Sequence, residues 1–137
     1  ACLFALQGLA KADDDRAITV DQLPQKAQEF IQKYFPKNEI SLAKMEKDFW
    51  EKKYEVVFVN GEKAEFLKDG SWEKVDCKYS TVLTGIVPQA IKDYVSKHYP
   101  EAKILKIERD SKTYEVKLNN QLELEFNKAF QLIDIDN

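Results

Sequence analysis

Residues 23–36 read LPQKAQEFIQKYFP, and residues 87–100 read VPQAIKDYVSKHYP. Each stretch opens with an aliphatic residue and a proline, and closes with an aromatic residue and a second proline. Proline suits the first turn of a helix but cannot extend one, so each stretch predicts a short helix with defined ends. Apolar residues recur at helical spacing in both, which predicts one buried stripe on each helix. We therefore expect a repeated unit that begins with this helix.

Alternating apolar residues follow each helix and predict β-strands. They are Ile40, Leu42, Met45, Tyr54, Val56, Phe58, Ala64, Phe66, Trp72 and Val75 after the first helix, and Ile104, Ile107, Tyr114, Val116, Leu118, Leu122, Leu124, Phe126, Phe130, Leu132, Ile133 and Ile135 after the second. Asn60-Gly61 and Asp69-Gly70 are hairpin-turn signals. The sequence thus predicts an α+β fold of two tandem repeats, residues 17–80 and 81–137, each with one helix and four antiparallel strands.

The N-terminal segment differs from the rest in composition. Residues 1–10 are mainly apolar, and Ala10-Lys11-Ala12 precedes three aspartates. This pattern predicts the remnant of a signal peptide with a cleavage site before Asp13, and hence a periplasmic or secreted protein. The alternative is an N-terminal helix or strand that belongs to the fold, so residues 1–16 are assigned as a signal-peptide remnant or an N-terminal tail. Removal of Cys2 on export would leave Cys77 unpaired, and no disulfide framework is expected.

Composition excludes several classes of protein. Hydrophobic residues make up 44% of the chain and aromatic residues 12%, which is enough to fill a core. The net charge is −3 although 33% of residues are charged, and such a mixed surface argues against nucleic acid or an anionic membrane as partner. No segment approaches the roughly 20 apolar residues that a membrane-spanning helix needs.

Signatures of catalysis are missing from the sequence. We find no glycine-rich phosphate loop, no cluster of metal-ligand residue types and no G-x-S-x-G motif. His98 is the single histidine, and its place on the apolar stripe predicts a half-buried structural residue rather than a catalytic base. The sequence therefore predicts a protein that is not an enzyme, with no catalytic residues, no metal and no cofactor.

Loop lengths distinguish the two repeats. The helices align at an offset of 64, Met45 aligns with Ile107 at 62, and Tyr54 aligns with Tyr114 at 60. The alignment predicts that the second repeat loses two residues after its helix and two more in its first hairpin. The longer hairpin of the first repeat carries Phe49 and Trp50, and duplicated units that differ in loops usually place their specificity there.

Outward-facing strand positions also differ between the repeats. Apolar residues occupy three of them in the first repeat, where the second has polar ones; they are Val57, Val59 and Leu67 against Lys117, Asn119 and Asn127. An antiparallel sheet with one covered face normally alternates apolar residues inward and polar residues outward, so these three break the rule.

Three motifs carry a resemblance to a known family. The chain has helices opened by Leu-Pro or Val-Pro, then Tyr-Glu-Val, then Phe66-x-x-Asp69-Gly70-x-Trp72. Over residues 18–137 it resembles the PepSY-like domains of secreted proteins from Bacteroidetes-type bacteria, which are similar in fold to the tandem-repeat β-lactamase inhibitor protein. Ala129-Phe130 replaces Asp69-Gly70 in the second repeat, so that turn is expected to differ. The resemblance implies export, an uninterrupted antiparallel sheet with helices on one face, and binding or inhibition rather than catalysis.

Three hypotheses about function remain open at this point. The first is a protein-binding module for an unidentified exported protein, such as an enzyme that it inhibits. Its candidate residues are Phe49, Trp50, Val57, Val59 and Leu67. The second is a binder of a small ligand or an envelope glycan, with Trp50 and Trp72 as stacking platforms, and the third is an assembly subunit that forms a weak homodimer. A concave pocket would favour a ligand and a flat surface a protein, whereas packing of these residues within the fold would remove the binding argument.

Overall fold

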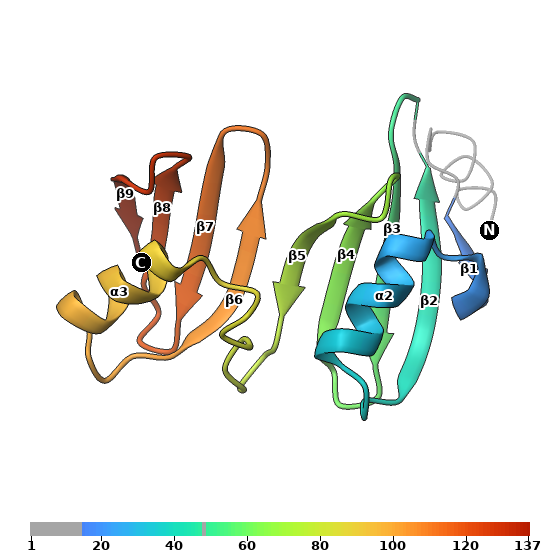
Figure 1. Cartoon of the computed structure of the whole chain (residues 1–137), viewed down its shortest axis with the longest axis horizontal. Helices are drawn as coiled ribbons and strands as arrows, with labels where there is room; N and C mark the ends of the chain where they lie inside the picture. The colour runs from blue at the N-terminus through green and yellow to red at the C-terminus, as the bar shows by residue number, and fades with distance from the viewer. Residues whose placement is uncertain (1–14, 48) are drawn as a thin grey trace, which may run out of the picture. The chain divides into compact units, whose positions relative to one another are not determined.

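The computed structural model describes residues 15–47 and 49–137 (Figure 1). Its elements are β1 (Arg16–Ile18), the 3₁₀ helix η1 (Val20–Gln22), α2 (Gln25–Tyr34), β2 (Ile40–Lys47), β3 (Lys52–Phe58), β4 (Lys63–Leu67), β5 (Trp72–Asp76), α3 (Gln89–His98), β6 (Ile104–Arg109), β7 (Thr113–Leu118), β8 (Glu123–Asn127) and β9 (Leu132–Asp136). The nine strands form an antiparallel sheet in sequence order, so the expected α+β fold with two α-helices is confirmed for these residues. Most of the expected signal-peptide remnant, including Cys2, lies outside the described residues.

One strand was not anticipated by the sequence pattern. β1 pairs antiparallel with β2, with Arg16 opposite Met45 and Ile18 opposite Ala43. A strand of three residues spans too few positions to display an alternating pattern, so the prediction of four strands for the first repeat was wrong by one.

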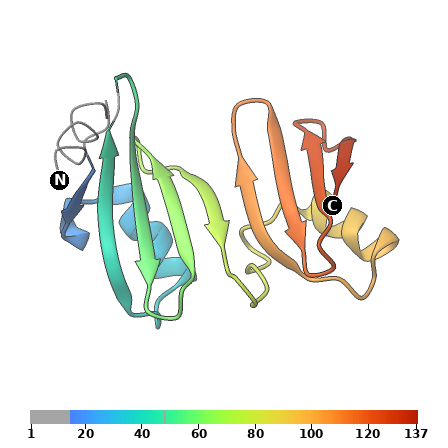
Figure 2. The ribbon, with the colours of Figure 1, turned by 180° about the vertical axis from the view of Figure 1, so that it is seen from behind.

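The chain folds as two compact units. The first unit contains the described residues up to Val59 together with Glu65–Trp72, and the second contains Asn60–Ala64 and Glu73–Asn137. Within each unit the helix covers one face of the strands: α2 lies over β2–β4, and α3 lies over β7 and β8 (Figures 1 and 2).

Aromatic and aliphatic side chains hold α2 on its strands. Ala27 and Ile31 on α2 are buried. The ring of Phe30 meets Phe66 edge-on at a centroid distance of 5.4 Å. Phe35, just after the helix, stacks on Phe58 at 4.7 Å. Burial of Ile31 and of Phe35 contributes about 1.5–3 kcal/mol each relative to exposure, so this stripe stabilises the docking of α2 on the strands.

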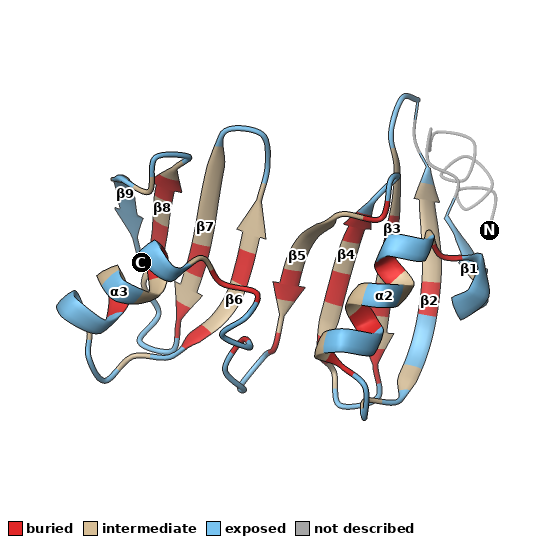
Figure 3. Cartoon of the chain, in the orientation of Figure 1, coloured by how far each residue is buried: buried red, intermediate tan, exposed pale blue. Residues whose placement is uncertain are grey.

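The second unit uses the same arrangement with different side chains. Ile91 and Val95 of α3 are buried, and the ring of Tyr94 meets Phe126 edge-on at 5.4 Å. Buried positions alternate along β7 and β8 (Figure 3). His98 is exposed and its ring lies 4.2 Å from that of Tyr94 in a tilted arrangement, so the expectation of a half-buried histidine was wrong. As the last residue of α3 it packs along the helix surface instead of against the sheet.

Strand register places all the extra residues of the first unit in one hairpin. Met45 pairs with Tyr54, and Arg109 pairs with Tyr114. Paired residues of β2 and β6 therefore differ in number by 64, and those of β3 and β7 by 60. The offset of 62 expected for the first strand was wrong, because it matched similar charged residues instead of paired positions. The β2–β3 hairpin is four residues longer than the β6–β7 hairpin.

The turn in the second unit keeps the backbone form of the first. Gly70 has a φ of 90°, and Phe130, which stands in the matching place, has a φ of 63°. The β8–β9 turn was expected to differ from the β4–β5 turn. That expectation was wrong for the backbone conformation, but the two turns do differ in the side chain that they carry. The ring of Phe130 stacks on Tyr114 at 5.4 Å, and Oδ1 of Asn127 accepts a hydrogen bond from the backbone N–H of Ala129 at 3.0 Å.

Two glycines with the same backbone conformation have different surroundings. A Cβ added to Gly70 would lie 2.8 Å from Cβ of Lys26 and 3.0 Å from the backbone nitrogen of Ala27, at the start of α2. A Cβ added to Gly61, which has a φ of 91°, would meet nothing closer than Cγ of Lys78 at 4.0 Å. Gly70 thus allows α2 to approach the β4–β5 turn, whereas Gly61 serves its turn alone.

We predict that Gly70→Ala destabilises the protein more than Gly61→Ala. Both variants place a Cβ in left-handed backbone, which costs about 1 kcal/mol, and Gly70→Ala adds about 1–3 kcal/mol of overpacking against α2. Urea unfolding followed by circular dichroism measures both losses. Equal losses in free energy of unfolding would show that the close approach of α2 contributes nothing.

Candidate binding surface

The face of the first unit opposite α2 carries apolar residues at one end. Leu42 pairs with Val57 across β2 and β3, on the side away from the buried Ala43 and Val56. Leu42 is exposed, Val57 is half-buried, and 63% of Val59 is exposed. Figure 2 shows these strands from the side without the helix. We call Leu42, Val57 and Val59 the valine end.

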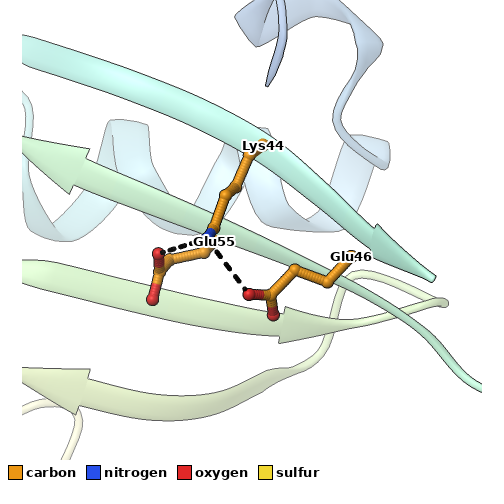
Figure 4. A network of polar contacts seen from close by, with 3 residues as sticks. All are labelled: Lys44, Glu46 and Glu55. Carbon is orange, nitrogen blue, oxygen red and sulfur yellow. Dashed lines mark ion pairs between the residues drawn. The ribbon is translucent and has the colours of Figure 1, made fainter. Parts of the chain in front are cut away.

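An ion network lies on the same face, next to the valine end. Nζ of Lys44 lies 3.3 Å from Oε2 of Glu46 and 3.7 Å from Oε1 of Glu55 (Figure 4). Burial acts to lower the pKa of Lys44, but its hydrogen bond to Glu46 and the charge of Glu55 outweigh burial, and the pKa is raised. Lys44 pairs with Glu55, two residues along each strand from the Leu42–Val57 pair and closer to the β2–β3 hairpin. The network therefore occupies the middle of the strands.

Leu67 does not join the valine end. It is exposed and is the last residue of β4, whereas Val57 and Val59 lie just before the turn that leads into β4. The antiparallel arrangement therefore places Leu67 at the opposite end of the strands. The three outward apolar residues picked out by the sequence do not form one patch.

The β2–β3 hairpin presents two aromatic rings to solvent. Phe49 is 77% exposed and Trp50 is 88% exposed, and their ring centroids lie 5.6 Å apart. Charged residues flank them: Nζ of Lys53 lies 3.5 Å from Oε2 of Glu51. We call Phe49 and Trp50 the hairpin tip. Trp72, the other aromatic candidate, is half-buried, and its ring lies 6.4 Å from Phe30 of α2, so it belongs to the helix-covered side.

A row of carboxylates crosses the second unit on the face opposite α3. Glu108 pairs with Glu115, Glu115 with Glu125, and Glu125 with Asp134. Burial raises the pKa of Glu115, and the charges of Glu123, Glu108 and Glu125 raise it further. Glu115, Glu123 and Glu125 alternate with the buried Val116, Leu124 and Phe126, so they face outward, and the register shows that carboxylates meet across four strands.

Cys77 is buried and forms no disulfide within the described residues. Burial, followed by the charges of Glu62 and Asp76, raises the pKa of its thiol to about 12. Because the thiolate is the reactive form, the raised pKa and the burial disfavour reactions of this thiol in the folded chain.

Two further observations concern metals and membranes. Among residues 15–47 and 49–137, no group of three or more His, Cys, Asp or Glu side chains is placed to hold a metal ion. No helix in this part of the chain is long and apolar enough to cross a membrane.

Comparison with known proteins gives a family and several solved structures. The family model described as "Putative beta-lactamase-inhibitor-like, PepSY-like" matches residues 52–134. A comparison with curated proteins finds no match.

Three solved structures are similar over nearly the whole chain. A "putative periplasmic protein" of the DUF2874 family from Bacteroides vulgatus ATCC 8482 is 56% identical, covers 93% of this chain and 100% of its own, and has a TM-score of 0.90. A "putative calcium-regulated periplasmic protein" from Bacteroides thetaiotaomicron is 57% identical over 90% of this chain and 98% of its own, with a TM-score of 0.88. A "putative periplasmic protein of unknown function" from Bacteroides vulgatus ATCC 8482 is 34% identical, covers 90% of this chain and 100% of its own, and has a TM-score of 0.86.

We predict that Glu115→Gln stabilises the protein at pH 7. The folded pKa of Glu115 lies above its ordinary value of 4.5, so the charged form weakens the fold at neutral pH, and this effect vanishes as pH falls below 4.5. Removing the like-charge contacts should gain about 0.5–1 kcal/mol at pH 7 and nothing near pH 3. Urea unfolding at both pH values, with the exposed Glu101→Gln as control, measures this. A gain that persists unchanged at pH 3 would contradict the electrostatic explanation.

Proposed function

The chain belongs to the β-lactamase-inhibitor-like, PepSY-like family, and on this basis we propose that it is a non-catalytic periplasmic binding module whose partner is another exported protein. The single observation that carries the proposal is the hairpin tip, where two adjacent aromatic rings are exposed on an extended loop. Its solved relatives are described as periplasmic proteins, which places the chain in the same compartment.

The hairpin tip has the composition of a binding hot spot. Tryptophan is enriched among residues that lose roughly 2 kcal/mol or more of binding energy on truncation, and such residues are surrounded by a polar rim. Glu51 and Lys53 supply charged groups beside Phe49 and Trp50. An aromatic ring held in water gains most when a partner pocket removes it from solvent. The hairpin tip is therefore the proposed anchor, and an exported enzyme with a cleft is the kind of partner that it suits.

The valine end and Leu67 have secondary roles in this proposal. The ion network of Lys44 separates the valine end from the hairpin tip, so a partner must cover charged groups to contact both. Burying ion pairs costs desolvation energy, and a contact centred on the hairpin tip avoids that cost. Trp72 does not contribute, because it packs beside Phe30.

The two units are proposed to be tandem repeats, residues 17–80 and 81–137, preceded by a signal-peptide remnant or tail at residues 1–16. The equal register of β2–β3 and β6–β7 around Val56 and Val116 supports this assignment. Repetition explains why the helix-covered faces agree, since both must bury a helical stripe, and leaves the longer hairpin as the feature specific to the first repeat.

Binding of a small ligand or an envelope glycan is the second candidate function. It is favoured by a pocket of about 400 Å³ in the second unit, which has the size of a small-ligand site. One solved relative is described as calcium-regulated, so ligand binding should be measured both in the presence of calcium and in the presence of a calcium chelator.

We predict that a photoreactive phenylalanine analogue placed at Trp50 crosslinks to one exported protein in the periplasm of the native host. With that protein purified, Trp50→Ala should weaken its affinity at least about 30-fold, the equivalent of roughly 2 kcal/mol, as measured by calorimetry. Tyr79→Ala is the matched control, because Tyr79 is a 95% exposed aromatic residue in the other unit. It should leave the affinity unchanged.

Unfolding midpoints of both variants should equal that of the wild type, since neither ring is part of the core. Wild-type affinity for Trp50→Ala, or equal losses for Trp50→Ala and Tyr79→Ala, would exclude the hairpin tip as the anchor.

A further inference from the structure

A pocket in the second unit lies outside the proposed protein-binding surface. It has a volume of about 400 Å³ and is lined by three lysines, Lys78, Lys106 and Lys117, and by Tyr79, Asn119 and Gln121. The volume lies within the range of about 300–1,000 Å³ that small-molecule sites occupy. The sequence pattern gave no sign of this pocket, because its residues come from three separate segments.

Two of the lysines lie side by side on neighbouring strands. Lys106 and Lys117 stand directly opposite each other in the β6–β7 register, where like charges are unfavourable, and each faces a carboxylate on its other side, Asp76 for Lys106 and Glu123 for Lys117. In the first unit the same register position holds the apolar pair Leu42 and Val57. The ion pairs within 4 Å that the structure gives for the described lysines Lys44 and Lys53 have no counterpart at Lys78, Lys106 or Lys117. Asp76, Glu115 and Glu123 lie near these lysines, but none of them forms an ion pair within 4 Å with Lys106 or Lys117 in the described part of the chain, so the ammonium groups can contact an anion.

Backbone strain is concentrated at the same pocket. Among the described residues, three other than glycine have a positive φ, and two of them line the pocket: Lys78 at 58° and Gln121 at 78°. Gln121 is equivalent to Gly61 of the first unit, by the offset of 60 residues between β3 and β7. Both have a positive φ, a conformation that glycine adopts without strain. Residues in such conformations cluster at ligand sites, so the side chain of Gln121 is a candidate contact.

Neighbouring groups define what the ligand must offer. Oδ1 of Asn119 accepts a hydrogen bond from the backbone N–H of Lys103 at 3.0 Å, which leaves Nδ2 as a donor. Oδ1 of Asp76, which also lines the pocket, accepts from the backbone N–H of Lys78 at 2.9 Å, which leaves Oδ2 as an acceptor. The exposed ring of Tyr79 provides a flat apolar surface. The pocket thus combines hydrogen-bond donors for an anion, a carboxylate oxygen that can accept from a hydroxyl, and an aromatic ring on which a flat group can stack.

We propose that this pocket binds a small hydroxylated anion, namely a monosaccharide that carries a carboxylate or a phosphate group. Lys106 and Lys117 contact the anionic group, Asp76 accepts from a hydroxyl, and Tyr79 stacks on the sugar ring. This site is independent of the hairpin tip, so the chain can retain it whether or not it captures a protein.

Titration of the ¹⁵N-labelled full chain with glucuronate, glucose 6-phosphate and glucose tests the proposal. The three probes have similar rings and differ in charge. We expect saturable shifts of the Lys106, Lys117 and Asn119 amides with at least one of the two anions, weaker binding at higher salt, and no shifts with glucose. Tighter binding of glucuronate identifies the carboxylate as the preferred group, and tighter binding of glucose 6-phosphate identifies the phosphate.

The variants Lys106→Met and Lys117→Met should each weaken the preferred anion by about tenfold, in line with loss of a charge-assisted hydrogen bond. Gln121→Gly should weaken it as well while raising the thermal unfolding midpoint, because glycine relieves the strained backbone. Absence of saturable shifts with both anions, equal binding of glucose, or an unchanged affinity in all three variants would overturn the proposal.

Discussion

The packing of one amphipathic helix on one face of antiparallel strands is the constraint on which both units depend. Side chains alternate across a strand, so burying Val56, Phe66, Val116 and Phe126 under a helix commits every second position to the core. A register slip of one residue would expose all of these side chains together, and this fixes the pairing of the strands. The remaining positions are free to vary, because nothing in the core depends on them.

The two units use that freedom in different ways. At one register position the first unit has Leu42 opposite Val57, and the second has Lys106 opposite Lys117. Two residues further along each strand, Lys44 forms an ion pair with Glu55 in the first unit, whereas Glu108 faces Glu115 as a like-charge pair in the second. Backbones with the same register therefore present an apolar and ion-paired surface in the first unit, and a surface of charged side chains in the second. Functional differences are expected on these faces and in the hairpins, rather than in the helices.

Much of the fold could be predicted from the sequence, because proline-bounded helical stripes and alternating strands are local patterns. The short strand β1 could not, since Arg16–Ile18 gains its structure only by pairing with β2. Exposure of Phe49 and Trp50 agrees with their loop position, whereas the separation of Leu67 from Val59 depends on strand direction. The lysine pocket requires the register of β6 and β7, including the irregularity between Ile104 and Lys106, and no local pattern encodes it.

The central claim is that the longer hairpin, and not the shared scaffold, carries partner recognition. The short β6–β7 turn is suited to replace it, because Oδ1 of Asp110 accepts hydrogen bonds from the backbone N–H groups of Lys112 at 2.7 Å and Thr113 at 2.8 Å. The direct measurement exchanges residues 46–53 for the sequence of residues 110–113 and compares amine-crosslinked periplasmic complexes with those of the wild type. We expect the exchanged chain to fold and to lose the wild-type complex. Formation of the same complex by a folded exchanged chain would contradict the claim.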